Sequence, residues 1–340
     1  MFAFGLKRIA WMLPTLLAAT FVAFALLHLA PGTPIDLIGD GAENAAVADS
    51  ASVARFRTQH LLDQPLWRQY LDYLGPFDLS PRGHAWFGGS GETPYGGLLV
   101  GDLGTEYLRP GVHVGTQIAE RLSITLPLML LGLLLGYAVG IPLGVFGATR
   151  RGSSVDRALT LSTFLLYSLP VFWIAVQLQS VLGRQGLDLI PVLWPSGDAS
   201  AGQIAASAVL PVLCAAYGVV AYVSRQTRAS MIEVLESDWI VALRARGISE
   251  QRLVWRHGLR NAALPLCVHL GQVIPALVAG SVLIETIFDI PGMGTYLHGG
   301  LLRREYDVVT GVVLVSACFA CLGLLLSDLL QALLDPRIRP

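Results

Sequence analysis

Six long apolar runs constrain the fold of this chain more than any other feature of its sequence. Each is close to the length of about 20 residues that a helix needs to cross the hydrocarbon core of a bilayer. Only 14% of the residues are charged, against about 25% in soluble domains. The sequence therefore predicts an all-α, polytopic membrane protein with about six transmembrane helices. The runs cover residues 9–30, 123–148, 158–182, 204–223, 264–288 and 308–334.

The basic residues are distributed unevenly between the segments that flank these runs. Fourteen of the 23 lysines and arginines lie in the terminal segments and in the second and fourth connections. Of the other nine, six lie in the long first connection, and long translocated segments contribute little to orientation. The positive-inside rule therefore predicts that both termini and the fourth connection are cytoplasmic.

This orientation predicts the order of parts along the chain. Because the first run continues past Ala23-Phe24-Ala25, which resembles a cleavage site, we expect an uncleaved anchor rather than a signal peptide. In the outer segment, Asp63 and Pro65 are placed to start a helix. The predicted parts are an anchor helix at 1–30, an extracytoplasmic segment at 31–122, a core of five transmembrane helices at 123–334 with a cytoplasmic loop at 224–263, and a cytoplasmic tail at 335–340.

The sequence contains no recognisable catalytic or cofactor-binding motif. Lys7 is its only lysine, so the Walker A loop, in which a lysine reaches the phosphates of ATP, is absent. The four cysteines lie inside apolar runs, and neither H-E-x-x-H nor G-x-S-x-G occurs. We therefore expect no cofactor, no metal, no nucleic-acid partner and no enzymatic activity, and any ATP hydrolysis would belong to another subunit.

Within the fourth connection, the stretch at 237–265, which extends into the start of the fifth run, carries more organised sequence than a simple turn needs. Asp238 can cap a first short helix, and Gly247 can end it in the left-handed conformation. Ser249 can cap a second helix that runs to about Asn261. In that helix Arg252, Arg256 and Arg260 would share one face, since they are four residues apart. The pattern predicts two short helices joined by a tight turn, which suits a docking surface.

Several polar residues lie inside the predicted spans, where such residues are costly and usually face the bundle or a cavity. Pro170 interrupts the third run, and Gln177 follows it. His269 and Gln272 lie one turn apart in the fifth run. They are candidates for a translocation path of a polar substrate. Hydrogen bonding between helices explains them equally well.

Several motifs in order along the chain resemble the dipeptide/oligopeptide/nickel permease family of bacterial ABC importers, in its first-permease (B subunit) branch. Thr33 stands where that branch usually has aspartate, and Val241, Ala242 and Leu243 match the general EAA motif only at the alanine. Residues 75–101 resemble an insertion relative to shorter members. The motifs are FALLHLAPGTP at 24–34, LDQPLWRQY at 62–70, GDLG at 101–104, the connection at 238–265, ETIFDIPGMG at 285–294 and DPRIR at 335–339.

The resemblance implies a type I ABC importer permease in the bacterial inner membrane. Its partners would be a second permease subunit, two cytoplasmic ATPase subunits and an extracytoplasmic solute-binding protein. In that family the fourth connection docks on the ATPase, and a gate or binding-protein contact lies near Glu285, Pro291 and Gly292, although Glu285 could instead pair with Arg303 or Arg304. The candidate docking residues are Asp238, Trp239, Ala242, Leu243, Arg244, Arg246, Gly247, Ile248 and Arg252.

Other interpretations of the same residues remain open. The arginines of the fourth connection can interact with anionic lipid headgroups and fix the topology, which we favour for Arg256 and Arg260. The cargo can be peptides, nickel or another small solute. An ion-coupled secondary transporter is a further alternative, but such proteins carry ion sites within their spans, and these spans lack deep acidic residues.

Overall fold

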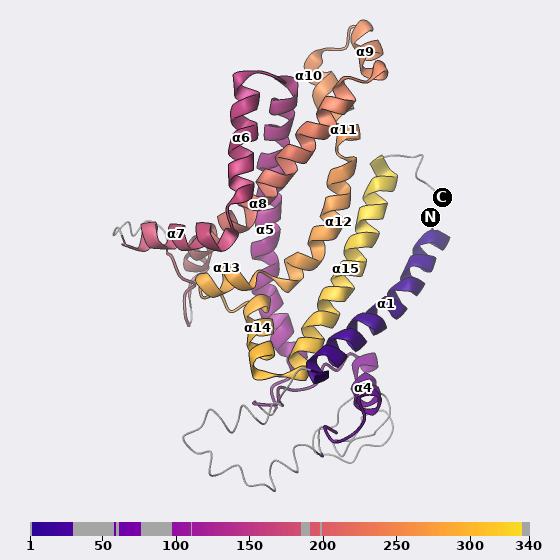
Figure 1. The fold of residues 1–340 in the computed structure, drawn as a ribbon, viewed down its shortest axis with the longest axis vertical. Helices are drawn as coiled ribbons and strands as arrows, with labels where there is room; N and C mark the ends of the chain where they lie inside the picture. Colours follow the sequence, from indigo (N-terminus) through magenta and orange to yellow (C-terminus); the bar gives the residue numbers. More distant parts are fainter. Residues whose placement is uncertain are drawn as a thin grey trace. The chain divides into compact units, whose positions relative to one another are not determined.

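The computed structural model describes residues 2–29, 58, 61–75, 97–109, 111–184, 191–197 and 199–334. The described chain is almost entirely helical, which confirms the predicted fold class (Figure 1). The predicted tail at 335–340 and most of residues 31–96 lie outside the described residues. The α-helices are α1 Phe2–Leu29, α4 Leu66–Leu74, α5 Val114–Thr149, α6 Ser154–Ser168, α7 Val171–Arg184, α8 Ala201–Leu235, α9 Asp238–Ala245, α10 Glu250–Arg252, α11 Leu259–Ala262, α12 Leu264–Ala279, α13 Val282–Ile287, α14 Met293–Arg303 and α15 Tyr306–Leu334.

Five helical segments of the described chain are long and apolar enough to cross a membrane, and a sixth span is present if α6 and α7 are taken together. The third predicted run, at 158–182, is interrupted at Pro170 as predicted, and α6 and α7 meet there at a bend of 92°. Leu169 adopts an extended conformation there, as residues before proline usually do, and Pro170 has no N–H to continue the helix. The five are Met12–Leu29, Val114–Thr149, Ala201–Leu235, Leu264–Ile287 and Tyr306–Gln331.

The fifth predicted span is also broken, near its far end. Pro265 lies in the first turn of α12, where its missing N–H costs nothing, as predicted. Gly280 then takes a φ of +71°, which ends α12, and the short α13 follows. The run at 264–288 therefore contains two helices and a left-handed joint.

The chain forms two compact units, which we describe separately. Unit 1 comprises residues 1–10, 123–295 and 318–340, and unit 2 comprises residues 11–122 and 296–317. Unit 1 contains most of the long apolar helices, and unit 2 contains α4 and most of α1.

A line of glycines on α5 brings that helix against α8 in unit 1. A methyl group at Gly132 would lie 2.6 Å from the Cβ of Ala215, and one at Gly140 would lie 2.9 Å from the Cβ of Val223. Gly136 and Gly144 meet Val219 and Thr227 in the same way. The offset between partners is constant, so the two helices run parallel in a fixed register.

A second close approach in unit 1 joins α12 to α15. A methyl group on Gly271 would lie 2.8 Å from the carbonyl oxygen of Gly323, and one on Gly323 would lie 2.6 Å from the carbonyl oxygen of Gly271. Each glycine therefore lies against the backbone of the other helix. Since backbone cannot move aside as a side chain can, neither position has room for a Cβ.

Unit 2 is held by aromatic rings and by a buried carboxylate. Tyr70 of α4 packs edge-on to Phe21 of α1, and its hydroxyl lies 2.9 Å from Thr20 Oγ1. Glu305 accepts hydrogen bonds from the backbone N–H groups of Tyr107, at 2.6 Å, and Leu108, at 2.9 Å. Burial raises the pKa of Glu305, while these N–H donors oppose the shift. As predicted, α4 begins immediately after Pro65.

The glycine line gives the first testable prediction. Gly144→Ala would place a methyl group 2.6 Å from the Ser224 carbonyl oxygen, so α5 and α8 would have to separate. We expect it to destabilise the protein by about 1–3 kcal/mol in thermal unfolding of the purified protein.

The matched control is Gly218→Ala on α8, where a methyl group would have no neighbour within 4 Å. Both substitutions favour the helix by up to about 1 kcal/mol, so their difference isolates the close approach. Equal melting temperatures for the two variants would show that the glycine line does not limit the spacing of the helices.

Candidate functional site

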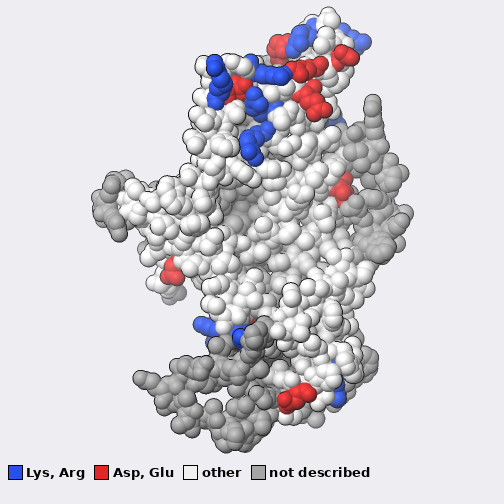
Figure 2. Space-filling model, viewed as in Figure 1, with Lys and Arg blue, Asp and Glu red and all other residues white. Residues whose placement is uncertain are grey.

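The segment between α8 and α12 forms a compact helical knob, the α9–α11 element, comprising residues 237–263 (Figure 1). The helix before it is longer than the predicted run at 204–223, because α8 continues to Leu235. Charged side chains gather on this element and on the adjoining end of unit 1, on the face seen in Figure 2. The 35-residue helix α8 therefore leads directly into the charged α9–α11 element.

Gly247 makes the tight turn that the sequence predicts. Its φ is +80°, and its N–H donates to the carbonyl of Arg244 at 3.0 Å. The N–H of Ile248 donates to the carbonyl of Leu243, so the last carbonyls of α9 are satisfied from beyond the turn. The predicted left-handed conformation is confirmed, and it explains the glycine at this position.

The predicted capping of α9 by Asp238 is wrong. Asp238 is the first residue of the helix, and Ser237 occupies the cap position. The Ser237 hydroxyl donates instead to the carbonyl of Val234 at 2.5 Å, so it makes no capping bond to α9. Ser249 does precede α10 as predicted, but its side chain makes no capping hydrogen bond either.

The second predicted helix is interrupted by a π-helical turn at Leu253–Gly258, between α10 and α11. Such turns insert extra backbone into a helix and occur frequently at functional sites. Leu253 is fully buried, whereas Trp255 is 47% exposed. Arg252, Arg256 and Arg260 are all exposed. The predicted second helix is therefore present from Glu250 to Ala262, but its middle is π-helical.

An ion pair spans the turn at Gly247. Arg244 bonds Glu250 through two of its nitrogens, and this hydrogen bonding lowers the pKa of Glu250. Arg244 thus has an ion-pair partner within the chain. Arg246, on the same turn, is exposed as well. Both paired side chains are largely exposed, so we assign the pair a role in shaping the turn rather than in stability.

The apolar residues of the element divide into buried and exposed sets. Ile240 is fully buried, while Leu243 and Ile248 are half-buried. Trp239 is 40% exposed, as a residue that inserts into a partner must be. Two further exposed side chains, Val241 at 52% and Trp255 at 47%, were not among the docking residues predicted from the sequence.

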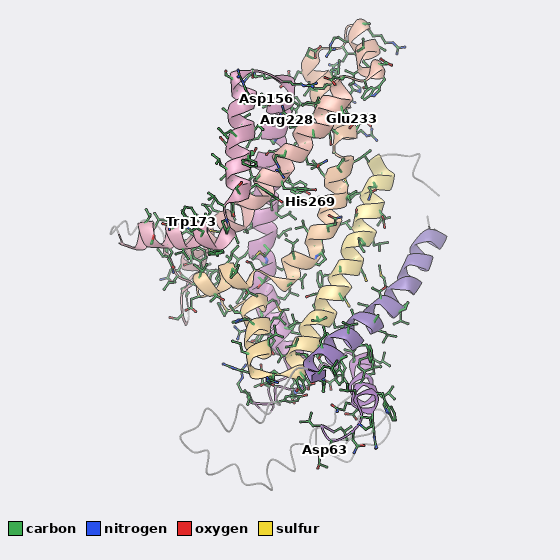
Figure 3. All side chains as sticks on the ribbon, viewed as in Figure 1. Asp63, Asp156, Trp173, Arg228, Glu233 and His269 are labelled. Carbon is green, nitrogen blue, oxygen red and sulfur yellow. The ribbon has the colours of Figure 1, made fainter. Side chains whose placement is uncertain are left out.

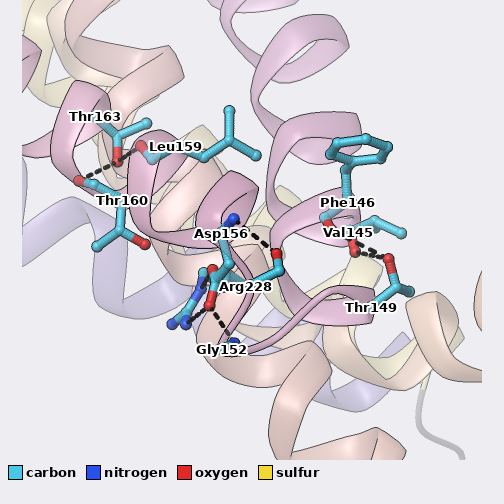
Figure 4. A network of polar contacts seen from close by, with 10 residues as sticks. Val145, Phe146, Thr149, Gly152, Asp156, Leu159, Thr160, Thr163 and Arg228 are labelled. Atoms are coloured by element: carbon cyan, nitrogen blue, oxygen red, sulfur yellow. Dashed lines mark hydrogen bonds and ion pairs between the residues drawn. The ribbon is translucent and has the colours of Figure 1, made fainter.

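Two ion pairs join the adjoining end of α8 to the α5–α6 turn and the start of α6. Figures 3 and 4 show one of them, between Arg228 and Asp156. Arg228 donates from Nε and an NH2 group to the Asp156 carboxylate, at 2.6 and 2.8 Å. The Gly152 N–H donates to the same carboxylate at 3.0 Å. Arg151 pairs with Glu236 beyond the end of α8. The base of the knob is therefore attached to the helical hairpin beside it.

The opposite end of unit 1 contains a loop organised around Glu285 of α13. Its carboxylate is buried and accepts from the Thr125 hydroxyl at 3.0 Å and from the Thr295 N–H at 2.9 Å. The backbone of Gly294 donates to it as well. Thr125 also accepts from the Met293 N–H at 2.8 Å. The four bonds tie α5, α13 and the start of α14 together.

Glycines make room for this carboxylate. A methyl group on Gly292 would lie 2.5 Å from the carboxyl carbon of Glu285, and one on Gly280 would collide with the carboxylate oxygens. Of the predicted outer residues, Glu285 and Gly292 are thus in one network, and Pro291 precedes Gly292 in the same loop. The Glu285 carboxylate thus accepts hydrogen bonds from threonine and backbone donors, and its alternative pairing with Arg303 or Arg304 stays a prediction.

The predicted path residues do not converge. His269 Nδ1 lies 2.8 Å from the Tyr137 hydroxyl, and its ring stacks on Tyr222 at 4.1 Å. This matches the alternative of hydrogen bonding between helices. Gln272 and Gln177 are exposed, on α12 and α7. His269, labelled in Figure 3, therefore lies between α12, α5 and α8.

A cavity of about 320 Å³ in unit 1 lies beside both helix breaks. Val171, directly after the α6–α7 bend, and Gly280, at the α12–α13 joint, both line it. The rest of its wall comes mainly from apolar residues of α5, α8 and α12, with Tyr217 and Ser281 as polar members. None of the three predicted path residues lines this cavity.

Residues 140–340 match the family described as the inner membrane component of binding-protein-dependent transport systems. The chain belongs to this family. It is 32% identical to the oligopeptide transport system permease protein AppB of Bacillus subtilis, over 99% of both chains. It is also 32% identical to the dipeptide transport system permease protein DppB of Escherichia coli K12, over 100% of this chain and 99% of that one.

A solved structure gives the same fold. The inward-facing MetNI methionine ABC transporter matches with a TM-score of 0.51 and 16% identity, over 64% of this chain and 96% of that chain. The chain is therefore a multi-pass membrane permease with the fold of an ABC importer subunit. The resemblance to the dipeptide/oligopeptide permeases of the B-subunit branch is confirmed. Permeases of this family work with separate ATPase and substrate-binding proteins.

The Glu285 network gives the second prediction. Glu285→Gln in the permease replaces an acceptor oxygen by an NH2 group that faces buried donors. We expect it to lower the free energy of unfolding by about 1–3 kcal/mol, measured by thermal unfolding in detergent.

Asp289→Asn is the control, because it makes the same acid-to-amide change four residues away. Asp289 is exposed and has a φ of +54°, which asparagine tolerates, so we expect a change within about 0.5 kcal/mol. A stable Glu285→Gln protein with impaired stimulation by its binding protein would instead identify Glu285 as a contact residue.

Proposed function

We propose that this permease imports peptides or similar small solutes, driven by ATP hydrolysis in partner subunits. The observation that carries the proposal is full-length similarity to permeases whose names assign them dipeptides and oligopeptides. A putative peptide permease of Brucella suis is 34% identical over the whole chain. The partners we expect are a second permease subunit, two cytoplasmic ATPase subunits and an extracytoplasmic solute-binding protein.

We infer that both termini and the α9–α11 element face the cytoplasm of a bacterial inner membrane. The support is the excess of basic residues in the segments on that side. The end of α8 and the α9–α11 element together carry seven arginines, from Arg225 to Arg260. An ATPase that docks there would meet a basic surface with exposed apolar side chains.

The α9–α11 element then couples ATP hydrolysis to transport. A knob transmits force only if it does not deform, and this one has a turn fixed by Gly247, a pair across that turn and a buried Ile240. It is joined to α8, a single helix of 35 residues. We therefore retain the candidate docking residues, which are Asp238, Trp239, Ala242, Leu243, Arg244, Arg246, Gly247, Ile248 and Arg252.

For the path through the membrane, we propose that solutes pass beside the two helix breaks. Discontinuous helices with a cavity at their joint are a common arrangement for substrate sites in transporters. Exposed Gln177 and Gln272 and half-buried His269 would provide polar contacts along the way. Glu285, Pro291 and Gly292 would form the outer gate, with Glu285 holding the loop rather than touching the solute.

A matched pair of glycines tests the coupling role. Gly247 has a φ of +80° and Gly197 a φ of +76°, and a methyl group at either would meet nothing within 4 Å. Alanine at each position should therefore carry a similar backbone penalty of about 1–2 kcal/mol. We expect Gly247→Ala to reduce the solute transported per ATP hydrolysed in the reconstituted transporter by at least about threefold, equivalent to a coupling change of about 0.6 kcal/mol.

Gly197→Ala should leave that ratio unchanged, because Gly197 lies between α7 and α8 and outside the α9–α11 element. The coupling role would be refuted by an unchanged ratio in Gly247→Ala, or by an equal drop in both variants.

Uptake measurements in whole cells test the cargo. Deleting the gene for this chain from its host should abolish accumulation of a labelled dipeptide, and a plasmid copy of the gene should restore it. Uptake of labelled nickel should stay unchanged. Loss of nickel uptake alone would establish the alternative of a nickel or other small-solute permease. Dipeptide uptake that persists in ATP-depleted vesicles under an ion gradient would establish the secondary-transporter alternative.

A further inference from the structure

A pocket of about 170 Å³ lies between α5, α6 and α8, close to the α5–α6 turn. Leu143, Gly144 and Gly147 line it from α5, and Leu159 and Thr160 line it from α6. From α8 come Ser224, Arg225 and Arg228. Arg228 lies one helical turn beyond the other two, four residues from Ser224 and three from Arg225. The absence of side chains at the two glycines leaves the space open. The pocket therefore has an apolar wall and a basic rim.

The two arginines of the rim differ in their partners. Arg228 is held by the Asp156 carboxylate, through the bonds shown in Figure 4. Arg225 is exposed, and its guanidinium lies 4.3 Å from the centre of the Tyr167 ring. Among the ion pairs of the described residues, none involves Arg225. Its charge is thus oriented by an aromatic ring and available to an anion.

The surroundings of the pocket strengthen this positive charge. Arg150, Arg151 and Arg157 lie at the same end of unit 1, and Figure 2 shows basic side chains gathered there. The acidic groups nearby are Asp156 and Glu236, which are both paired with arginine, and Glu233 of α8. Basic groups therefore outnumber acidic ones around the rim.

The neighbouring surface shows which kind of anion fits. Leu161, Phe164 and Leu165 of α6 are each more than half exposed, on a helix that belongs to the candidate broken span. Such an apolar face lies against acyl chains in a bilayer. A ligand with a phosphate and attached hydrocarbon would satisfy the arginine and the apolar surface together, whereas a free phosphate would satisfy only the arginine.

We propose that this pocket binds the headgroup of an anionic phospholipid. The phosphate pairs with Arg225 and meets the Thr160 hydroxyl at the rim, the glycerol backbone lies against Leu143 and Leu159, and the acyl chains follow the exposed face of α6. The lipid then occupies the groove beside the Asp156–Arg228 pair that fastens α8 to the α5–α6 turn. The proposal depends on the membrane location of the chain and is independent of which solute it transports.

Native mass spectrometry of the purified transporter complex tests the site, with phosphatidylglycerol titrated into detergent. We expect Arg225→Gln to weaken the tightest phosphatidylglycerol binding about fivefold, the effect of one arginine near a membrane surface. Arg225→Lys keeps the charge and should restore most of the affinity. Arg157→Gln removes an exposed arginine of the same end that does not line the pocket, and should leave this binding unchanged.

Three results would overturn the proposal. Unchanged phosphatidylglycerol binding in Arg225→Gln would remove the arginine from any lipid site. An equal loss in Arg157→Gln would show only general attraction to a basic surface. Displacement of the lipid by millimolar glycerophosphate, without a preference for the intact lipid, would identify a site for free phosphates. Since Arg225 is exposed, its replacement should leave the melting temperature unchanged, which thermal unfolding checks.

Discussion

The close approach of α5 and α8 is the constraint on which the rest of unit 1 depends. Four glycines on α5 face four residues of α8 at every fourth position, so the helices touch along a row rather than at one point. Without a strong hydrophobic force between helices in lipid, such close packing of small residues is a main source of stability. The pair forms a two-helix spine to which α6, α12 and α13 attach.

The features at the two ends of the spine follow from different physical chemistry. At one end, arginine–carboxylate pairs hold the α5–α6 turn and the base of the α9–α11 element, and the arginine of each pair remains partly exposed. At the other end, Glu285 is buried, and threonine and backbone donors replace water around its carboxylate. The first arrangement suits a surface that meets a protein partner, and the second suits a loop that must keep its shape among apolar helices.

The sequence predicted the elements that depend on local properties. The apolar runs predicted the spans because crossing a bilayer needs a minimum length, and Gly247 predicted its own turn because few other residues adopt its backbone conformation. Pro170 marked the place of the bend after Leu169 but not its size of 92°, because prolines in membrane helices often cause only mild kinks. The π-helical turn had no sequence signal, and the partner of Glu285, Thr125, lies 160 residues away. The glycine line was missed although its spacing of four residues was visible.

The fixed register of α5 against α8 restricts how these helices can move. Each glycine accommodates one residue of α8, so sliding would force the side chains of α8 over the adjacent, larger residues of α5. The next matching position is four residues along, a displacement of about 6 Å at the rise of an α-helix. Small axial shifts are therefore blocked, and a push on the end of α8 must turn or tilt the spine as one lever.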